Sequence, residues 1–567
     1  MILDLRHDVL PAAMGVPIVI VGGGPAGITL ALQLEKRGVP SLLLEAGSTR
    51  IDAAGQDFYR AASIRPEDHG PVHRYRHRVL GGTSAVWGGR CIPFDPIDFE
   101  ERPWLSDARW PIRYEELAGY YPEAVAMCRA GSPHFTADLA VTDAAGAGMF
   151  DMCDPDLVAD RIERFSEPTH FGRFYQERLR QSRAAVVLLN APVLRVVAHP
   201  SGRAVKGVVI AAPDGRRIEV GARAVVVASG ALETARLLLS STDQKSCGLG
   251  NERDLVGRFY QSHLEGHVGE LRVPPGASSR MDYFRDGDGI YCRRYLWLSP
   301  EAQRRERLAG LVLRPTHPKV ADPAHGNPVL SAMFLVKGML LPEYARGMNS
   351  TDSAEARRVG KGVPLHLRHL GNVLRGSPGL ARFATDWTRR RVLARRKLPS
   401  VFLADRDGRY PIDVNAEQEP DRDSRVLLGE ARDSLGQQRL VIDWRTSEAD
   451  LARVARGLAV ADRALRRAGA ARILLPDPEE AVARLTRVGG HHVGTARMAE
   501  SPASGVVDGH GEAFDVAGLH VLGAAAFPTS GFANPTLTIV ALAVRMADRL
   551  AGRMANFRMG RAVNRAA

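Results

Sequence analysis

Residues 16–45 carry the pattern that decides the fold, and they read VPIVIVGGGPAGITLALQLEKRGVPSLLLE. The β-branched run at 16–21 predicts a buried strand, and the glycines at 22–27 predict a tight turn. The apolar spacing over 28–37 predicts a helix, and residues 40–45 predict a second strand. The order strand, glycine turn, helix, strand is typical of a Rossmann-like sheet.

Gly22, Gly24 and Gly27 fit the chemistry of a dinucleotide-binding turn. Glycine lets the backbone approach a pyrophosphate, and the following helix offers free N–H groups and a favourable dipole. Glu45 lies 18 residues past Gly27, near the spacing of about 20 residues at which an acid accepts hydrogen bonds from a ribose. The segment therefore predicts a dinucleotide site, and it does not by itself choose between NAD and FAD.

A second glycine-rich segment, Arg78-Val-Leu-Gly-Gly-Thr-Ser-Ala-Val-Trp-Gly-Gly-Arg90, lies downstream. It combines small hydroxyl side chains with one large aromatic residue, Trp87. A loop of this composition can press against a flat ring. As a pattern alone, it is equally typical of two ordinary turns at its two Gly-Gly pairs.

Four segments near the C-terminus bear chemistry: 489–498 (GGHHVGTARM), 506–508 (VVD), 519–529 (LHVLGAAAFPT) and 533–540 (ANPTLTIV). A histidine with a pKa near neutrality can accept the proton of a hydroxyl. A neighbouring side-chain amide can orient that hydroxyl and stabilise developing negative charge. A histidine and an asparagine from these segments are therefore candidates for the oxidation of an alcohol.

Taken in order, these segments resemble the glucose-methanol-choline (GMC) family of FAD-dependent oxidoreductases, nearest in look to the pyranose-oxidase branch. The resemblance is dense over 16–45, 79–90, 224–239 and 489–550. It implies a two-domain α/β flavoprotein. A Rossmann-like FAD-binding domain is joined to an α+β substrate domain built on an antiparallel sheet.

The resemblance also implies that FAD is the cofactor and that it is bound noncovalently. In pyranose oxidases the loop matching 78–90 carries a histidine that bonds to the flavin, and the matching position here is Val86. In the family pattern H-x-x-G-T-x-R-M the active histidine stands four residues before the threonine, which makes His491 the base and leaves His492 as the variable position. Asn534 matches the second catalytic group, which is His in some branches and Asn in others.

The residues predicted to contact FAD come from the glycine turn, the loop, two strand ends and the segments near the C-terminus. They are Gly22, Gly24, Pro25, Ala26, Gly27, Glu45, Ala46, Arg78, Gly81, Gly82, Thr83, Ser84, Val86, Trp87, Gly88, Val193, Ser229, Gly230, Gly523, Ala524, Pro535 and Thr536. A helix that begins at Pro535 would aim its N-terminal dipole at reduced flavin, a benefit of about 0.3–1 kcal/mol. No metal is predicted, because His491, His492 and His510 lack H-x-x-x-H spacing and an acid cluster.

Three segments make up the predicted domains. Residues 1–267 form the FAD-binding domain, discontinuous and with substrate-domain insertions, and 268–475 form the substrate-binding domain. Residues 476–567 return to the FAD-binding domain with the catalytic His and Asn.

Charge and composition narrow the choice of partners and compartment. The 567 residues carry a formal charge of +12 and are 45% hydrophobic, as in ordinary globular proteins. The chain shows no nucleic-acid-binding motif, so a nucleic-acid partner is not predicted. Five scattered cysteines and an N-terminus without a leader pattern predict a reducing, cytoplasmic location. The basic, helical segment Leu365–Leu398, broken at Ser377-Pro378, is interpreted as a solvated face in preference to a peripheral membrane contact.

The predicted reaction is the oxidation of a CH–OH group of a sugar, glycoside, aminoglycoside-like compound or other alcohol. The hydroxyl proton goes to His491 and the hydride to flavin N5. Electrons then pass to oxygen or to a quinone or cytochrome, and the sequence does not decide which. Three alternatives stay open: a flavin-dependent lyase or decarboxylase on the same fold, a small-primary-alcohol dehydrogenase, and a plain NAD-linked dehydrogenase.

Overall fold

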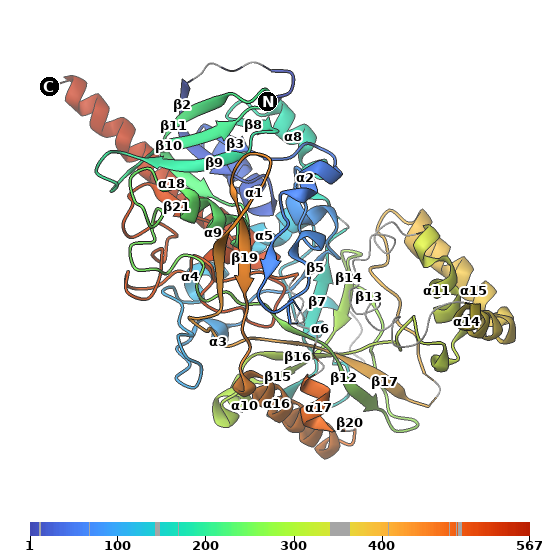
Figure 1. The fold of residues 1–567 in the computed structure, drawn as a ribbon. Helices are drawn as coiled ribbons and strands as arrows, with labels where there is room; N and C mark the ends of the chain where they lie inside the picture. Colours follow the sequence, from blue (N-terminus) through green and yellow to red (C-terminus); the bar gives the residue numbers. More distant parts are fainter. Residues whose placement is uncertain are drawn as a thin grey trace.

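The computed structural model describes residues 1–8, 10, 13–66, 68–141, 148–167, 169–340, 363–405, 407–475, 477–483, 485 and 490–566. Gly489, the first residue of the motif GGHHVGTARM, lies outside this set. Two large sheets dominate the described chain, and Figure 1 shows them at opposite ends of the molecule.

The first large sheet carries the dinucleotide pattern. Within the described residues it has eight strands in the order β1-β8-β3-β2-β11-β10-β9, with β21 beside β11. The strands are β1 (Ile2–Asp4), β2 (Ala13–Val21), β3 (Ser41–Leu44), β8 (Ala185–Leu189), β9 (Val193–Ala198), β10 (Val205–Ala211), β11 (Arg217–Val227) and β21 (Leu519–Val521). The neighbouring pairs β1–β8, β8–β3, β3–β2, β2–β11 and β11–β21 are parallel, whereas β10 pairs antiparallel with both β11 and β9.

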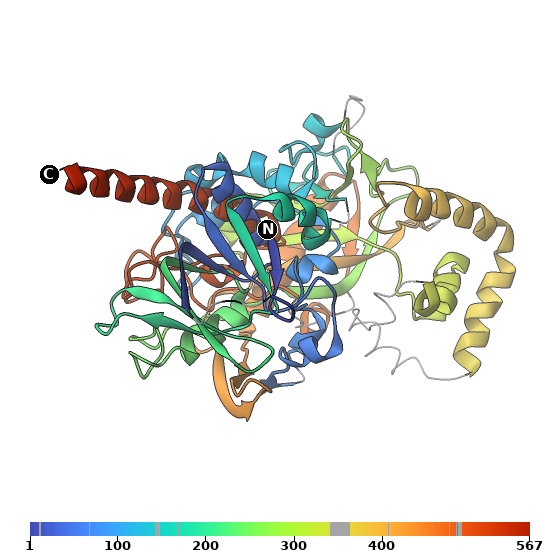
Figure 2. The same ribbon diagram turned by 90° about the horizontal axis from the view of Figure 1, so that it is seen from above.

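The predicted strand–turn–helix–strand unit is present as β2, α1 (Pro25–Lys36) and β3. β3 is buried along its whole length, as expected for an inner parallel strand. α1 packs against β3 and against the long C-terminal helix α18 (Thr536–Ala566), which also contacts α5 (Tyr121–Cys128). Figure 2 shows the far end of α18 standing clear of the body. Two segments from opposite ends of the chain therefore stack on one side of this sheet.

The second large sheet is antiparallel, and its order within the described residues is β20-β12-β17-β16-β15-β6. Its strands are β6 (Leu157–Val158), β12 (Leu264–Arg272), β15 (Leu296–Leu298), β16 (Leu311–Pro315), β17 (Arg409–Ala416) and β20 (Arg472–Leu474). The helix α16 (Glu448–Arg467) packs against β6, β15 and β20, and α17 (Pro478–Ala483) packs against β12. Figure 1 shows α10 (Pro300–Glu306) beside α16 below this sheet.

Two smaller sheets join the large ones. One has the order β13-β14-β7-β5, and the other has the order β18-β19-β4. Their strands are β4 (Ala62–Ser63), β5 (Arg90–Cys91), β7 (Ile162–Phe165), β13 (Phe284–Arg285), β14 (Tyr291–Arg294), β18 (Arg425–Arg432) and β19 (Gln438–Asp443). The predicted boundary between residues 267 and 268 falls inside β12, and the chain crosses between the sheets several times. The division into domains therefore remains a proposal.

Short helices lie between the strands, and a group of longer ones projects from the side. The short ones are α2 (Ala53–Asp57), α3 (Pro96–Phe99), α4 (Glu115–Ala118), α6 (Ala137–Ala140), α7 (Phe171–Phe174), α8 (Gln176–Gln181) and α9 (Ala231–Ser240). The projecting group is α11 (Pro328–Leu340), α14 (Val363–Arg375) and α15 (Ser377–Trp387), which we call the protrusion together with the π-helical turn Thr388–Leu393 that follows. Figures 1 and 2 both show it apart from the two large sheets. The predicted helical character of 365–398 is found over 365–393, with the break at Gly376, whereas 394–398 is not helical.

Candidate active site

A cavity with a volume of about 780 Å³ runs between the first sheet and the C-terminal segments. All but two of the residues predicted to contact FAD line it, together with both predicted catalytic residues. The ones that line it are Gly22, Gly24, Pro25, Ala26, Glu45, Ala46, Arg78, Gly82, Thr83, Ser84, Val86, Trp87, Gly88, Val193, Ser229, Gly230, His491, Gly523, Ala524, Asn534, Pro535 and Thr536. Segments spread over more than 500 positions of the sequence thus meet at one cavity.

Gly27 and Gly81, the two exceptions, do not line the cavity but hold its wall in shape. A Cβ on Gly27 would lie 2.0 Å from the carbonyl oxygen of Gly22, so only glycine lets α1 pack this closely on the turn. A Cβ on Gly81 would lie 2.5 Å from the amide nitrogen of Gly172. These two glycines therefore serve the packing beneath the site, and their predicted contact with FAD stays a prediction.

The cavity wall fits a dinucleotide because of the backbone it exposes. Gly24, Gly88, Gly230 and Gly523 all line the cavity, and a Cβ on any of them would meet nothing within 4 Å. The N-terminus of α1 at Gly24 has no side-chain cap and no acid in its first turn. Its free N–H groups and positive dipole are therefore open to an anion such as a pyrophosphate.

Glu45 supports the glycine turn with both carboxylate oxygens. Oε2 accepts a hydrogen bond from the amide of Gly23 at 2.8 Å, and Oε1 accepts one from Gly47 at 2.7 Å. Burial raises the pKa of this carboxyl, and the two amide donors oppose that effect. Glu45 also lines the cavity, and each of its carboxylate oxygens keeps a second lone pair. The predicted hydrogen bond from a ribose hydroxyl to Glu45 is therefore still available.

The loop 78–90 is fixed by hydrogen bonds from its small side chains. Ser84 Oγ donates to the carbonyl of Gly81 at 2.6 Å and accepts from the amide of Phe171 at 3.0 Å. Trp87 Nε1 donates to the carbonyl of Thr169 at 3.0 Å. These contacts hold the cavity-lining side of the loop in place.

His491 and Asn534, the predicted catalytic pair, lie next to each other in the cavity wall. Asn534 Nδ2 is 3.0 Å from His491 Nε2. The side-chain oxygen of Asn534, Oδ1, is buried and has no hydrogen-bond partner in the described structure. A hydroxyl entering here would meet the histidine nitrogen, the amide N–H and an unused acceptor.

Backbone pairing brings these residues together from distant parts of the chain. The amides of Gly494, Ala496 and Met498 donate to the carbonyls of Ala524, Ala525 and Ala526 at 2.8–3.0 Å. Gln261 and Val493 exchange two backbone hydrogen bonds of 3.1 Å as an antiparallel bridge. In that register, residue 263 stands opposite residue 491, so the beginning of β12 is placed against the catalytic histidine.

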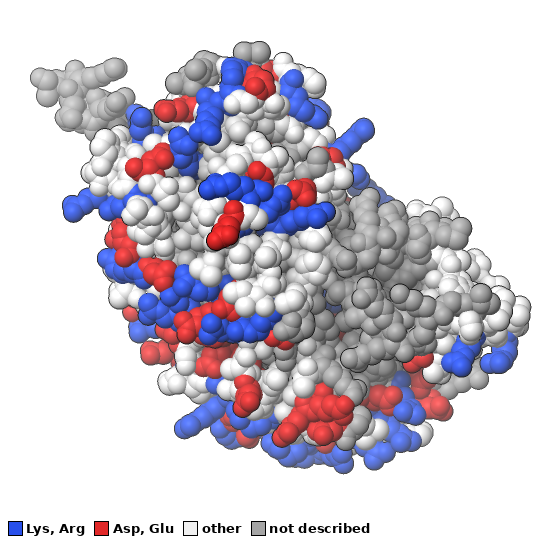
Figure 3. All heavy atoms as spheres, in the orientation of Figure 1, with Lys and Arg blue, Asp and Glu red and all other residues white. Residues whose placement is uncertain are grey.

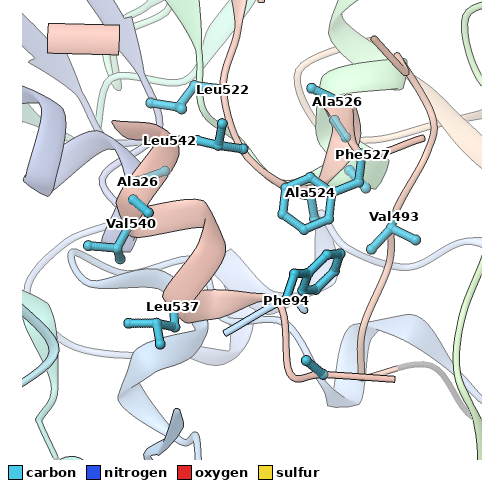
Figure 4. Close-up of a cluster of buried hydrophobic side chains, with 14 of the residues drawn as sticks. Ala26, Phe94, Val493, Leu522, Ala524, Ala526, Phe527, Leu537, Val540 and Leu542 are labelled. Carbon is cyan, nitrogen blue, oxygen red and sulfur yellow. The ribbon is translucent and has the colours of Figure 1, made fainter. Parts of the chain in front are cut away.

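Aromatic packing anchors the same segments from behind. The Phe94 and Phe527 rings are 5.4 Å apart and edge-on, and Phe94 is also edge-on to Trp110 at 5.8 Å. Figure 4 shows Phe94 and Phe527 in one buried cluster with Val493 and Leu537. Val493 and Leu537 lie two and three residues after His491 and Asn534, so both catalytic segments are anchored in the core.

Two residues that the sequence analysis missed, His263 and Glu265, complete the site. Glu265 Oε1 is 3.1 Å from His491 Nδ1, and His263 Nδ1 is 3.0 Å from the same nitrogen. His263 Nε2 lies 3.2 Å from the carbonyl of Ser530, to which it can only donate. The sequence does indicate that His263 and Glu265 share one face, because residues two apart in an extended segment point to the same side. It does not indicate which part of the chain that face contacts.

These contacts assign the tautomer of His491. Because neutral His263 keeps its proton on Nε2 for Ser530, its Nδ1 is an acceptor, and the carboxylate of Glu265 is an acceptor as well. The proton between these groups therefore belongs to His491 Nδ1. His491 Nε2, the nitrogen beside Asn534, then carries the lone pair, as a base requires.

The charges around His491 oppose one another. Burial lowers the pKa of His491, Glu265 raises it, and His263 and Arg90 lower it again, with a net lowering from the ordinary value. Burial raises the pKa of Glu265, but the neighbouring imidazoles of His263 and His491 outweigh it and leave this carboxyl well below its usual range. At neutral pH the pair is therefore a neutral histidine beside a carboxylate.

His492 takes part in a different hydrogen-bond chain. The hydroxyl of Tyr260 lies 2.6 Å from His492 Nδ1 and 2.7 Å from His69 Nε2. Burial holds the pKa of His492 well below its ordinary value. It has no contact with Asn534 in the described structure, which favours His491 as the base.

Among the described residues, one group of side chains has ligand atoms close enough to hold a metal ion: His263, Glu265 and His491. Their hydrogen bonds account for this geometry. His510 lines a separate pocket, so it does not join His491 and His492 as a ligand set.

Comparison with known proteins agrees with this geometry. Models of GMC oxidoreductases match residues 174–265 and 420–543, and an FAD-binding domain model matches residues 15–66. The chain belongs to the GMC oxidoreductases. The family, the Rossmann-like FAD-binding fold, the cofactor FAD and the enzyme class predicted from the sequence are confirmed.

Relatives of this GMC oxidoreductase include both dehydrogenases and oxidases. 2-Methyl-1,2-propanediol dehydrogenase of Mycolicibacterium austroafricanum is 24% identical over 95% of this chain and 96% of its own length. Paromamine 6'-oxidase of Streptomyces fradiae is 26% identical over 94% of this chain and 91% of its own length. Pyridoxine 4-oxidase from Mesorbium loti shares the fold, with a TM-score of 0.51 and 19% identity over 94% of this chain and 99% of its own. The pyranose-oxidase branch stays a prediction.

Proposed function

We propose that this GMC oxidoreductase oxidises a hydroxyl of a diol or sugar-like compound, with His491 as the base and Asn534 as the residue that orients the hydroxyl. One observation carries the proposal. His491 Nε2 and Asn534 Nδ2 lie 3.0 Å apart in the wall of the cavity that also contains the glycine turn of the FAD-binding fold.

Bound FAD supplies the acceptor for two electrons and the hydrogen of the C–H bond. The chain's own residues handle the other proton. The substrate hydroxyl donates to His491 Nε2 and accepts from the Asn534 amide, which replaces their resting contact with each other. The proton moves to Nε2, and the resulting imidazolium is held by Glu265 through Nδ1. Asn534 stabilises the alkoxide character that develops on oxygen.

The charges at the cavity wall bear on the substrate class. Arg90 lines the cavity, and its Nε is 3.0 Å from the buried carboxylate of Glu163. Glu163 is also 2.8 Å from Arg314 and 3.9 Å from Arg293, and the negative charge of Asp413 acts on both of these arginines as well. Of these three arginines Arg90 lines the cavity, where its positive charge disfavours a cationic substrate beside it. Neutral diols and sugars therefore fit the proposal better than amino sugars.

The test is anaerobic mixing of the purified holoenzyme with a panel of diols, sugars, glycosides and amino sugars. Loss of flavin absorbance near ~450 nm with one class identifies the substrate. Recovery in air then distinguishes an oxidase from a dehydrogenase that uses a quinone or cytochrome. FAD that no hydroxyl compound reduces would overturn the proposal and favour a lyase.

Two variants test the roles within the site. His491→Ala should retain FAD and lose about 10²- to 10⁴-fold in the rate of flavin reduction, as removal of a general base does. Asn534→Ala should lose about 10²- to 10³-fold in the same step. His199 is exposed and does not line the cavity, so His199→Ala is the matched control and should reduce flavin at the normal rate.

A further inference from the structure

The helix α14 in the protrusion exposes an apolar face and buries polar side chains, the reverse of a typical helix in a soluble protein. Its Leu367, Leu370 and Leu374 are 59%, 44% and 68% exposed. Its buried side includes two polar residues, His369 and Asn372, with 0% and 6% exposed. Soluble helices normally turn their apolar stripe to the core.

The helix geometry makes this separation sharp. At about 100° per residue, the three leucines fall within roughly 60° of one another, and His369 and Asn372 lie nearly opposite. The polar side is satisfied within the protrusion. His369 Nδ1 is 3.0 Å from Ser331 Oγ of α11, and Asn372 Nδ2 donates to the carbonyl of Pro323 at 2.9 Å. Among the described residues, α14 is therefore held by its polar side, and its leucine stripe stays largely exposed.

Other exposed apolar side chains gather on the same protrusion. Ten large apolar side chains are strongly exposed among the described residues, and six of them lie here: Val336, Leu367, Leu370, Leu374, Val392 and Leu393. In Figure 3 the visible outer side of the protrusion is mostly uncharged, with basic side chains along its lower edge. Grouped exposed apolar side chains of this kind mark an interaction surface.

The charge of this segment selects the partner. Residues 363–398 contain nine Lys and Arg residues and a single acid, Asp386. Arg368 and Arg375 are exposed on α14 itself, at about 80–100° from Leu367 around the helix. Apolar side chains flanked by arginine match a surface that is apolar below and anionic above.

We propose that the protrusion binds the surface of an anionic lipid bilayer, with the leucine stripe of α14 in the acyl boundary and the arginines at the headgroups. No helix in the described part of the chain is long and apolar enough to cross a membrane, so this contact is peripheral. A second copy of the chain would bring two strongly basic surfaces together, which charge repulsion opposes. A nucleic acid would use the arginines and leave the leucines in water.

The position of the protrusion gives this contact a consequence for the active site. The chain leaves the protrusion at Leu393 and, after residues 394–398, reaches Pro399 and Ser400, which line the active-site cavity. A groove lined by Arg389, Arg390 and Leu393 shares Tyr283 with that cavity. A bilayer bound at the protrusion therefore lies near residues that line the active-site cavity.

The experiment is co-sedimentation of the holoenzyme with vesicles of phosphatidylcholine alone and of phosphatidylcholine with phosphatidylglycerol. Binding to the anionic vesicles only is expected, and it should weaken at about 1 M salt, where the Debye length is ~3 Å. The double substitution Leu370→Asp with Leu374→Asp should lower vesicle binding at least tenfold. Arg368→Glu with Arg375→Glu should lower it about fivefold or more for each charge.

Matched controls separate this surface from general effects. Leu139, 62% exposed on α6, gives Leu139→Asp, and the exposed Arg183 and Arg203 give a double Arg→Glu variant. Both controls should bind vesicles like the wild type, and all variants should keep the wild-type FAD content and Tm. Equal binding by the Leu370/Leu374 variant and the wild type would overturn the proposal. So would concentration-dependent dimers that the same variant abolishes, or tighter binding to a DNA duplex than to anionic vesicles.

Discussion

Glu265→Gln is the substitution that tests the tautomer and charge logic of the active site. Gln keeps the size of Glu, and its amide oxygen can still accept the proton on His491 Nδ1, so the lone pair stays on Nε2. What it removes is the negative charge 3.1 Å from that nitrogen. The protonated form of His491 then loses its counter-charge.

The magnitude follows from the contact. Two unit charges about 4 Å apart attract by about 4 kcal/mol at an effective dielectric constant of ~20. The side chain of Glu265 is 37% exposed, so solvent screens part of this, and a net value of about 1.5–2 kcal/mol is appropriate. That corresponds to a fall of roughly one unit in the pKa of His491 and a loss of about tenfold in kcat/KM.

The sign decides the assay. His491 must be neutral to accept a proton, so the acidic limb of the profile of kcat/KM against pH reports its pKa. Glu265 favours the protonated form, and removing its charge lowers that pKa. The acidic limb of Glu265→Gln should therefore move to lower pH while the plateau falls. Glu270→Gln is the matched control, because Glu270 lies further along β12 and pairs at 2.7 Å with exposed Arg409.

Two results would refute this reasoning. A plateau that falls without any movement of the acidic limb would make Glu265 a packing residue. A limb that moves to higher pH would mean that Glu265 does not stabilise protonated His491. Normal FAD content in the variant is required for either conclusion.

The remaining predictions concern the cofactor and the core. Gly24→Ala should fold normally but bind FAD at least about tenfold more weakly, because its Cβ meets no protein atom and projects into the cavity. Titration of the apo-protein with FAD measures this affinity. Gly119→Ala is the control, because a Cβ at Gly119 is equally unhindered but lies outside the cavity. Acid precipitation should release all FAD into the supernatant, since Val86 stands where covalent relatives have histidine, and flavin retained in the pellet would contradict it. Arg102→Met should cost about 3–5 kcal/mol in chemical denaturation, because it strands the carboxylate of Glu417 that Arg102 contacts twice at 2.6 Å in the core. Burial raises the pKa of Glu417, but the charge of Arg102 outweighs burial and leaves this pKa lowered. The stabilisation by the Arg102–Glu417 pair should therefore be complete above pH ~4.3 and be lost as the pH falls further. Arg304→Ala, which breaks an exposed pair at 2.7 Å, is the control and should cost less than about 1 kcal/mol.

The fold and most of the cofactor site followed from local sequence patterns. The strand, glycine turn and helix at residues 16–37 need only neighbouring residues to form, and their chemistry is set by backbone shape. His491 and Asn534 were found because the resemblance to the family is carried by short motifs near the C-terminus. Gly27 and Gly81 were predicted from the same motifs to contact FAD; neither lines the cavity, and a Cβ on either would meet neighbouring backbone atoms. A motif records that glycine is needed, and it does not record which neighbour requires it.

Other features depended on pairings that no local pattern contains. Glu265 reaches His491 because Gln261 and Val493, more than 200 positions apart, form an antiparallel bridge. The leucine stripe of α14 is exposed because α11 takes the polar side of the helix, although the sequence alone shows only an amphipathic segment. Sequence by itself determined the strand–turn–helix unit and the family of this protein, and it predicted the cofactor site and the candidate base, because short motifs carry all of these. Tertiary structure alone decided which carboxylate sets the tautomer of that base and which face of α14 meets the outside, because both depend on contacts between distant segments.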